Sequence, residues 1–174
     1  MSALAYVISA HGFGHAARSA AVLEALARRA DAPERVAVLT TVPEWFFRQS
    51  LSRTDGFEFR RVPTDLGLVQ SNSLEEDLEA TLTRLEQHLE QPDGMIGPLE
   101  EALREIEPDA VACDISPWGL AAAARLGLPA VLVENFTWSF IYRGYGDRRL
   151  ERCARGFERL FRADHHLRLE PFCG

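Results

Sequence analysis

The chain has 174 residues, of which 47% are hydrophobic and 26% are charged, a composition typical of a globular protein with room for one well-packed domain. Lys and Arg total 19 and Asp and Glu total 26, giving a formal net charge of −7 at pH 7, which disfavours nucleic acid and anionic membranes as partners. No apolar run approaches the ~20 residues that span a membrane, and no basic segment precedes the first apolar run as it does in a signal peptide. The three cysteines lie far apart and form no C-x-x-C pair, so we expect reduced thiols and a cytoplasmic protein.

Short apolar segments alternate along the chain with longer segments of helical periodicity. Residues 4–10 form a continuous apolar run, as in a strand that is buried on both faces. Residues 15–30 follow as a helix, in which Arg18 lies outside the apolar stripe. Further strands are predicted at residues 35–41, 56–62, 109–113 and 130–135, with a possible sixth strand at residues 165–170.

Capping residues predict where two helices in the middle of the chain begin. Ser73 and Glu76 form an S-x-x-E capping box ahead of a regular stripe of leucines. Pro98 is expected to open the next helix, which stops before Pro108.

The helix after the fourth strand has the clearest boundaries in the sequence. Ser116 is expected as its N-cap, Pro117 as its first residue and Gly127 just past its end. Its alanine-rich run has little bulk and should pack close to the sheet. Thr137 is expected to begin an aromatic-rich helix, and residues 147–162 to form the last one.

Strands that alternate with helices imply right-handed β-α-β crossovers and a parallel sheet. We therefore expect residues 1–174 to form a single α/β domain, a Rossmann-like doubly wound parallel sheet. With the strands numbered along the chain, the order 3-2-1-4-5 makes the first and fourth strands neighbours.

In such sheets, ligands bind beyond the carboxyl ends of the strands. The residues that the sequence places there are Ser9, His11 and a glycine loop after the first strand, Thr40 and Thr41 after the second, Asp114 and Ser116 after the fourth, and Glu134 and Asn135 after the fifth. We therefore expect His11, His15 and Asp114 to share one cleft.

Three chemistries and one structural role compete for the loop "HGFGH". Gly12, Gly14 and Ala17 satisfy the dinucleotide-binding pattern G-x-G-x-x-A, but the second strand lacks the acidic residue that holds the ribose. A metal site built on His11-x-x-x-His15 and Asp114 needs both histidines on one helix. A general base at the helix start, with Asp114 orienting His15, is the third possibility. Alternatively, His15 and Asp114 only cap the two helices.

An aromatic cluster follows the fifth strand and could stack on a sugar or another ring. We expect Trp138 to form the wall of a binding site and Phe140, with alternate rings, to lie in the core. The segment "PEWFF", residues 43–47, is expected in the core or in a lid.

The stretches "YVISAHGFGHAARSAAVLEAL" and "DAVACDISPWGLAAAARLGLPAVLVENFTWSFIY" together resemble the N-terminal half of GT-B-fold glycosyltransferases, which carry a Gly-rich loop ending in Gly-His after the first strand. The chain is similar above all to the glycosyltransferase-like N-terminal region of L-arabinokinases and bacterial relatives. The patterns "GHGFGHATR", "GLVQ" and "NFTWDFIY" of that region match residues 11–18, 67–70 and 135–142.

The resemblance implies the acceptor-binding domain of an inverting, metal-independent nucleotide-sugar glycosyltransferase, with His15 as general base and Asp114 as the residue that orients it. The residues expected to bind substrate are His11, Gly12, Phe13, Gly14, Ser116, Glu134, Asn135 and Trp138. The acceptor is a small molecule or a glycan, the nucleotide sugar is a co-substrate, and no cofactor is implied.

The nucleotide-binding half of such enzymes is a second domain, so we expect this chain to be inactive alone and to contact a C-terminal domain or form a homodimer. The alternative that stays open is a non-catalytic sugar-binding or regulatory module of a sugar-kinase-type protein.

Overall fold

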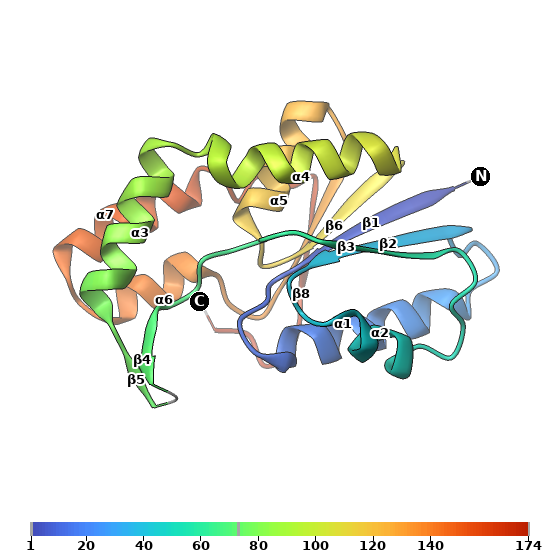
Figure 1. Ribbon diagram of the computed structural model, residues 1–174, viewed down its shortest axis with the longest axis horizontal. Helices are drawn as coiled ribbons and strands as arrows, with labels where there is room; N and C mark the ends of the chain where they lie inside the picture. Colours follow the sequence, from blue (N-terminus) through green and yellow to red (C-terminus); the bar gives the residue numbers. More distant parts are fainter. Residues whose placement is uncertain (1, 73, 174) are drawn as a thin grey trace.

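The computed structural model describes residues 2–72 and 74–173. Its centre is a six-stranded sheet in the order β3-β2-β1-β6-β7-β8, in which every neighbouring pair is parallel (Figure 1). The strands are β1 (Ala3–Ile8), β2 (Arg35–Thr40), β3 (Phe57–Arg61), β6 (Ala110–Asp114), β7 (Ala130–Glu134) and β8 (His165–Arg168). Counted along the chain, this order is 3-2-1-4-5-6, which confirms the Rossmann-like α/β fold and the predicted neighbours.

Helices cover both faces of the sheet (Figure 1). One face packs against α1 (Phe13–Ala27) and α2 (Glu44–Ser50). The other packs against α3 (Leu78–Glu90), α4 (Asp93–Ile106), α5 (Pro117–Leu126), α6 (Trp138–Gly144) and α7 (Arg148–Glu158). Within the described residues, no helix is both long and apolar enough to cross a membrane.

Strand β1 shows why two cores form. Ala5 and Val7 face the larger cluster, whereas Tyr6 and Ile8 face the cluster beneath α1. All four side chains are almost completely buried. Because successive residues of a strand point to opposite faces, the continuous apolar run buries β1 on both sides.

The boundaries of α5 agree with the sequence analysis. Ser116 is the N-cap, Pro117 begins the helix and Gly127 follows its end in the left-handed conformation. The helix lies close to the sheet, because a Cβ atom on Gly119 would come within 2.8 Å of Val7 and 2.9 Å of Cys113. The expected close packing of this helix is therefore confirmed.

Three predicted helix starts were wrong. Helix α1 begins two residues earlier than expected, at Phe13. Helix α4 begins at Asp93, so Pro98 lies inside it. Helix α3 begins at Leu78 with Asp77 as its N-cap, because the backbone of Glu76 is paired in the antiparallel strands β4 (Gln70–Asn72) and β5 (Glu75–Glu76).

The capping box predicted ahead of α3 depends on Ser73, which lies outside the described residues. The carboxylate of Asp77 accepts a 2.8 Å hydrogen bond from the amide of Ala80 and caps the helix.

Candidate active site

His15 and Asp114 meet at the carboxyl edge of the sheet, where β1 and β6 lie side by side. The register pairs Ile8 with Asp114, and the turn after β1 passes through Gly12, whose φ of +81° favours glycine. This turn starts α1 two residues before His15. His15 Nδ1 then lies 2.7 Å from Asp114 Oδ1, with His15 8% exposed and Asp114 fully buried.

Asp114 is also held by two other side chains of α1. Arg18 donates from Nε to Oδ2 at 2.9 Å and from Nη2 to Oδ1 at 2.5 Å. Ser19 Oγ donates to Oδ2 at 3.0 Å. The sequence analysis placed Arg18 outside the apolar stripe and so missed its contact with Asp114. The spacing of residues 15, 18 and 19, which places the three side chains on one face of a helix, could have indicated this contact.

The capping role considered for His15 and Asp114 is not observed. Helix α1 begins after Gly12 without a side-chain cap. Helix α5 is capped by Ser116, whose Oγ accepts from the amide of Gly119 at 3.1 Å and donates to the carbonyl of Thr64 at 2.6 Å. These two bonds engage the buried hydroxyl of Ser116. Ser116, which was predicted to bind substrate, therefore serves as the N-cap of α5.

A second aspartate, Asp65, lies beside the loop after β1 and was missed by the sequence analysis. Its Oδ2 accepts hydrogen bonds from Ser9 Oγ and, at 3.1 Å, from Trp138 Nε1. Burial of the carboxylate raises the pKa of Asp65, although these two donors and the nearby charges of His11 and His15 oppose the shift. The "GLVQ" resemblance pointed to this segment but not to the aspartate that precedes it.

His11 packs in the same cluster and points to different partners from His15. Its ring contacts Trp138 edge-on, with centroids 5.1 Å apart, whereas His15 contacts Phe136 at 5.6 Å. Gly67 makes room for His11: its φ is +58°, and a Cβ atom there would lie 2.6 Å from His11 Nδ1. Within the described residues, no group of three or more His, Cys, Asp or Glu side chains is arranged to hold a metal ion.

The expected division of the aromatic rings was wrong. Trp138 is 3% exposed and Tyr142 is 1% exposed, whereas Phe140 is 44% exposed. Trp138 and Tyr142 are one helical turn apart and stack with centroids 6.0 Å apart, and both belong to the larger core. Trp138 therefore lies in the core and contacts this edge of the sheet through its hydrogen bond to Asp65.

Other rings are exposed beside the glycine loop. Phe13 is half exposed and packs against Phe46, with centroids 5.2 Å apart, and against Trp45 at 6.2 Å. Trp45 is also half exposed. A hollow of 210 Å³ adjoins these rings and is lined by Ala10, Gly12, Phe13, Thr41, Val42 and Pro43. Gly12 and Gly14 are exposed, and a Cβ atom on Gly14 would contact nothing within 4 Å.

The two polar residues at the end of β7 have different surroundings. Asn135 Oδ1 accepts a hydrogen bond from Arg18 Nη1 at 2.5 Å, which joins Asn135 to the His15–Asp114 pair. Glu134 is 4% exposed and lies 3.4 Å from His166 and 3.6 Å from Arg168, both on β8. The carboxylate of Glu134 is therefore engaged by the neighbouring strand.

The end of β2 lacks the carboxylate that a dinucleotide site needs. Thr40 is buried and its Oγ1 accepts from the amide of Val42 at 3.2 Å. Glu44 already belongs to α2 and forms an ion pair with Arg48 at 2.7 Å.

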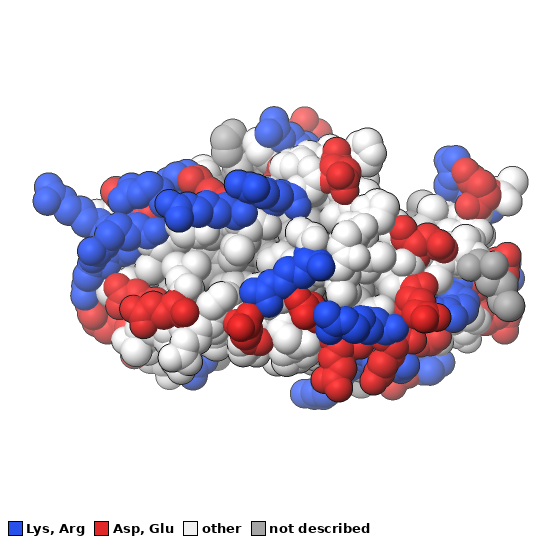
Figure 2. All heavy atoms as spheres, turned by 90° about the horizontal axis from the view of Figure 1, so that it is seen from above, with Lys and Arg blue, Asp and Glu red and all other residues white. Residues whose placement is uncertain are grey.

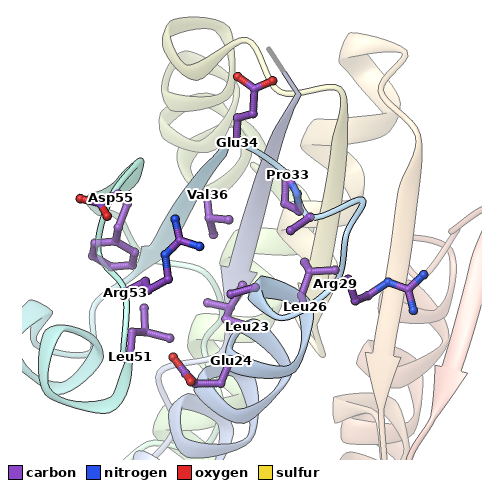
Figure 3. Close-up of a pocket in the computed structure, with 13 residues that line it drawn as sticks. Leu23, Glu24, Leu26, Arg29, Pro33, Glu34, Val36, Leu51, Arg53 and Asp55 are labelled. Carbon is purple, nitrogen blue, oxygen red and sulfur yellow. The ribbon is translucent and has the colours of Figure 1, made fainter.

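A separate hollow of 280 Å³ lies between α1 and strands β2 and β3 (Figure 3). Leu23, Leu26, Val36 and Leu51 line its apolar part, and Glu24, Arg29, Arg53 and Asp55 lie around it (Figure 3). None of the candidate site residues lines it, so it is distinct from the site described above.

The fold matches that of known glycosyltransferases over almost the whole chain. It superposes on LpCGTa in complex with UDP with a TM-score of 0.58, covering 95% of this chain and 46% of that one at 16% identity. UGT89C1 of Arabidopsis thaliana, complexed with UDP, gives a TM-score of 0.57 with 95% and 44% covered at 15% identity. The calicheamicin glycosyltransferase CalG4 gives 0.55 with 85% and 38% covered at 22% identity. The chain thus has the Rossmann-like fold of one half of a GT-B glycosyltransferase.

The sequence itself matches a protein whose name describes a different activity, that of a sugar kinase. It is 35% identical over 142 residues to L-arabinokinase of Arabidopsis thaliana, covering 81% of this chain. The chain is therefore homologous to a region of L-arabinokinase and spans 13% of that protein's length. No protein-family model matches the chain.

Proposed function

We propose that the chain is the acceptor-binding half of an inverting, metal-independent nucleotide-sugar glycosyltransferase. The observation that supports this most directly is the buried His15–Asp114 pair, 2.7 Å apart at the carboxyl edge of a GT-B-type sheet. His15 is the general base and Asp114 orients it.

The base works through the ring nitrogen that Asp114 does not contact. Asp114 accepts a hydrogen bond from the N–H of Nδ1, which leaves the lone pair of Nε2 free to take a proton from an acceptor hydroxyl. Within the described residues, Nε2 makes no hydrogen bond. His15 lies in the first turn of α1, where the helix dipole disfavours an imidazolium, so the carboxylate is needed to stabilise it.

The transfer then proceeds in one displacement. The acceptor oxygen forms a bond to the anomeric carbon from the face opposite the leaving group. The bond from that carbon to the phosphate oxygen breaks, its electron pair leaves with the nucleoside diphosphate, and the acceptor proton moves to His15. The configuration at the anomeric carbon is inverted.

The acceptor, a small molecule or a glycan, is expected to lie over the glycine loop. Gly12 and Gly14 leave open space, Phe13 offers an exposed ring, and Asn135 retains an amide NH₂ group for donation. His11 lies at the same edge against Trp138. Among the predicted contacts, Ser116, Glu134 and Trp138 have side chains that are buried and engaged within the protein.

The diphosphate of the donor is expected to bind mainly to a second domain, which would neutralise it with a helix N-terminus and side chains. Support comes from the similar structures, which are complexes with UDP and of which this chain covers less than half. The location is expected to be cytoplasmic, which agrees with three unpaired cysteines, of which Cys173 is exposed.

The test is transfer by the full-length protein carrying His15→Ala. With a panel of nucleotide sugars and glycan or small-molecule acceptors, release of nucleoside diphosphate should fall by about 10² to 10⁴. Asp114→Asn should also lower it, and the matched control His165→Ala, an exposed histidine on β8, should not. Transfer that survives His15→Ala in a folded protein overturns the base assignment.

A second candidate is a non-catalytic sugar-binding or regulatory module of a sugar-kinase-type protein. The homology to a region of L-arabinokinase favours it. It is supported if the chain binds a free monosaccharide in calorimetry while the full-length protein releases no nucleoside diphosphate from any nucleotide sugar. If the chain binds the monosaccharide only when a nucleotide sugar is also present, the result contradicts this second candidate.

A further inference from the structure

Arg18 contacts three of the residues that the sequence assigns to the site. Its guanidinium donates to both oxygens of Asp114 and, through Nη1, to Oδ1 of Asn135. Its Nη2 also lies 2.9 Å from His15 Nδ1. The Arg18 side chain is only 19% exposed, so these contacts are shielded from solvent.

We propose that Arg18 is a positioning residue that fixes the orientation of Asp114 toward His15 and thereby holds the tautomer of His15 that carries its proton on Nδ1. The proposal rests on the proposed function in one respect only, namely that His15 is the base. The geometry of the cluster and its test stand without it.

The orientation follows from the shape of the guanidinium. A planar fork binds both oxygens of a carboxylate at once and so fixes the plane of that carboxylate. Ser19 Oγ adds a third bond to Oδ2, and the bond to Asn135 anchors the other end of the fork. Asp114 therefore presents Oδ1 to His15 in one orientation.

The 2.7 Å separation between His15 Nδ1 and Asp114 Oδ1 identifies the tautomer. Two lone pairs repel at that distance, so a proton lies between the two atoms and Nδ1 is the donor. His15 Nδ1 then has no lone pair in the ring plane, so it cannot accept a hydrogen bond from Arg18 Nη2, although the two atoms lie 2.9 Å apart. Arg18 thus acts on His15 through Asp114, whose two oxygens it holds.

The test is NMR of the chain with ¹⁵N-labelled histidine, which reports the tautomer of each imidazole. In the unaltered chain, neutral His15 should carry its proton on Nδ1. In Arg18→Met, Asp114 loses the guanidinium that fixes its plane, so the pure Nδ1–H signal of His15 should become mixed. Arg18→Lys keeps the charge but loses the fork, so its signal should be mixed as well. Arg28→Met, at an exposed arginine just past the end of α1, is the matched control and should leave the tautomer unchanged.

The outcomes separate this inference from the proposed function. An unmixed Nδ1–H signal in folded Arg18→Met overturns the role of Arg18, as does an Nε2–H tautomer of His15 in the unaltered chain. If Arg18→Met does not fold, the tautomer in Arg18→Lys decides, and an unmixed Nδ1–H signal counts against the proposal. Full transfer activity in His15→Ala overturns the base assignment while leaving the NMR results intact.

Discussion

At the scale of single residues, two aspartates at the same edge of the sheet differ through their partners. Asp114 is fully buried but accepts from the cation of Arg18 as well as from His15 and Ser19. Asp65 has two uncharged donors, Ser9 and Trp138. Asp65 as a whole is half-buried, yet atoms crowd its carboxylate and raise its pKa. The two carboxylates therefore differ in that Asp114 is bound by the guanidinium of Arg18, whereas Asp65 is bound by uncharged donors.

The raised pKa of Asp65 predicts a pH dependence of stability. The folded state binds a proton that the unfolded state has already lost, so stability falls as the pH rises from the ordinary range of an aspartate, about 3.9, through the folded-state pKa. Asp65→Asn keeps an oxygen acceptor for Ser9 and Trp138 and removes the ionisation. Its free energy of unfolding at pH 7 should therefore exceed that of the unaltered chain.

Urea denaturation between pH 4 and pH 8 measures this effect. The difference between Asp65→Asn and the unaltered chain should grow with pH and then level off. Asp55→Asn, at an exposed position, serves as the control and should give no such trend. A difference that shrinks as the pH rises would show that the charged form of Asp65 stabilises the fold.

Sequence reasoning brought His15 and Asp114 together but missed Arg18 and Asp65. The first pair follows from strand order, because neighbouring parallel strands bring their ends to the same place. Arg18 is separated from Asp114 by 96 positions and Asp65 from Trp138 by 73. The helical spacing of residues 15, 18 and 19 places Arg18 on the face of His15 but does not show that its long side chain turns inward. The irregular segment that contains Asp65 has no periodic signal.

At the scale of elements, helix ends were predictable where the cap is local. Ser116, Pro117 and Gly127 delimit α5 as expected. The start of α3 was misplaced because the strand pair β4–β5 occupies the preceding backbone. Pairing between segments thus moved the start of the helix to Leu78, where Asp77 caps it.

The cap of α5 gives a prediction about stability. Ser116→Ala removes a cap and also leaves the buried carbonyl of Thr64 without its donor, so the free energy of unfolding should fall by about 2 kcal/mol. Thr137→Ala, which removes a longer 3.3 Å bond at an exposed helix start, should cost about 0.5 kcal/mol. Urea denaturation of both variants checks this, and equal losses would mean that the bond to Thr64 contributes nothing.

At the scale of the whole molecule, charge is unevenly distributed despite the net charge of −7. Basic side chains form a row on the upper left of Figure 2, over the α7 end of the molecule. On α7 and in the residues just after it, exposed arginines recur at spacings of four and three residues, namely Arg148, Arg152, Arg155, Arg159 and Arg162. In the described part of the chain none of these five has an acidic partner within ion-pair distance, whereas the neighbouring Arg143 and Arg149 are paired with Glu158 and Glu79.

Repulsion along this row predicts that a charge reversal stabilises the protein. In Arg152→Glu the new carboxylate faces Arg148, Arg149 and Arg155 at helical spacing, so the melting temperature should rise by about 1 to 2 °C. The gain should disappear in 0.5 M salt, because exposed charges are then screened. Arg53→Glu, at an exposed site outside the row, is the control. A lower melting temperature in Arg152→Glu would show that repulsion among these arginines does not destabilise the protein.

The sequence by itself determined the alternation of strands and helices, the parallel sheet and the meeting of His15 with Asp114. These follow from periodicity and from strand order, which are properties of short segments and of their sequence along the chain. Only the tertiary structure decided that Arg18 turns inward to Asp114 and that Asp65 reaches Trp138. It also placed Trp138 in the core and left Phe13 exposed. Such contacts join segments that lie far apart in the sequence. Local patterns allow several positions for each of these side chains, and packing selects one of them.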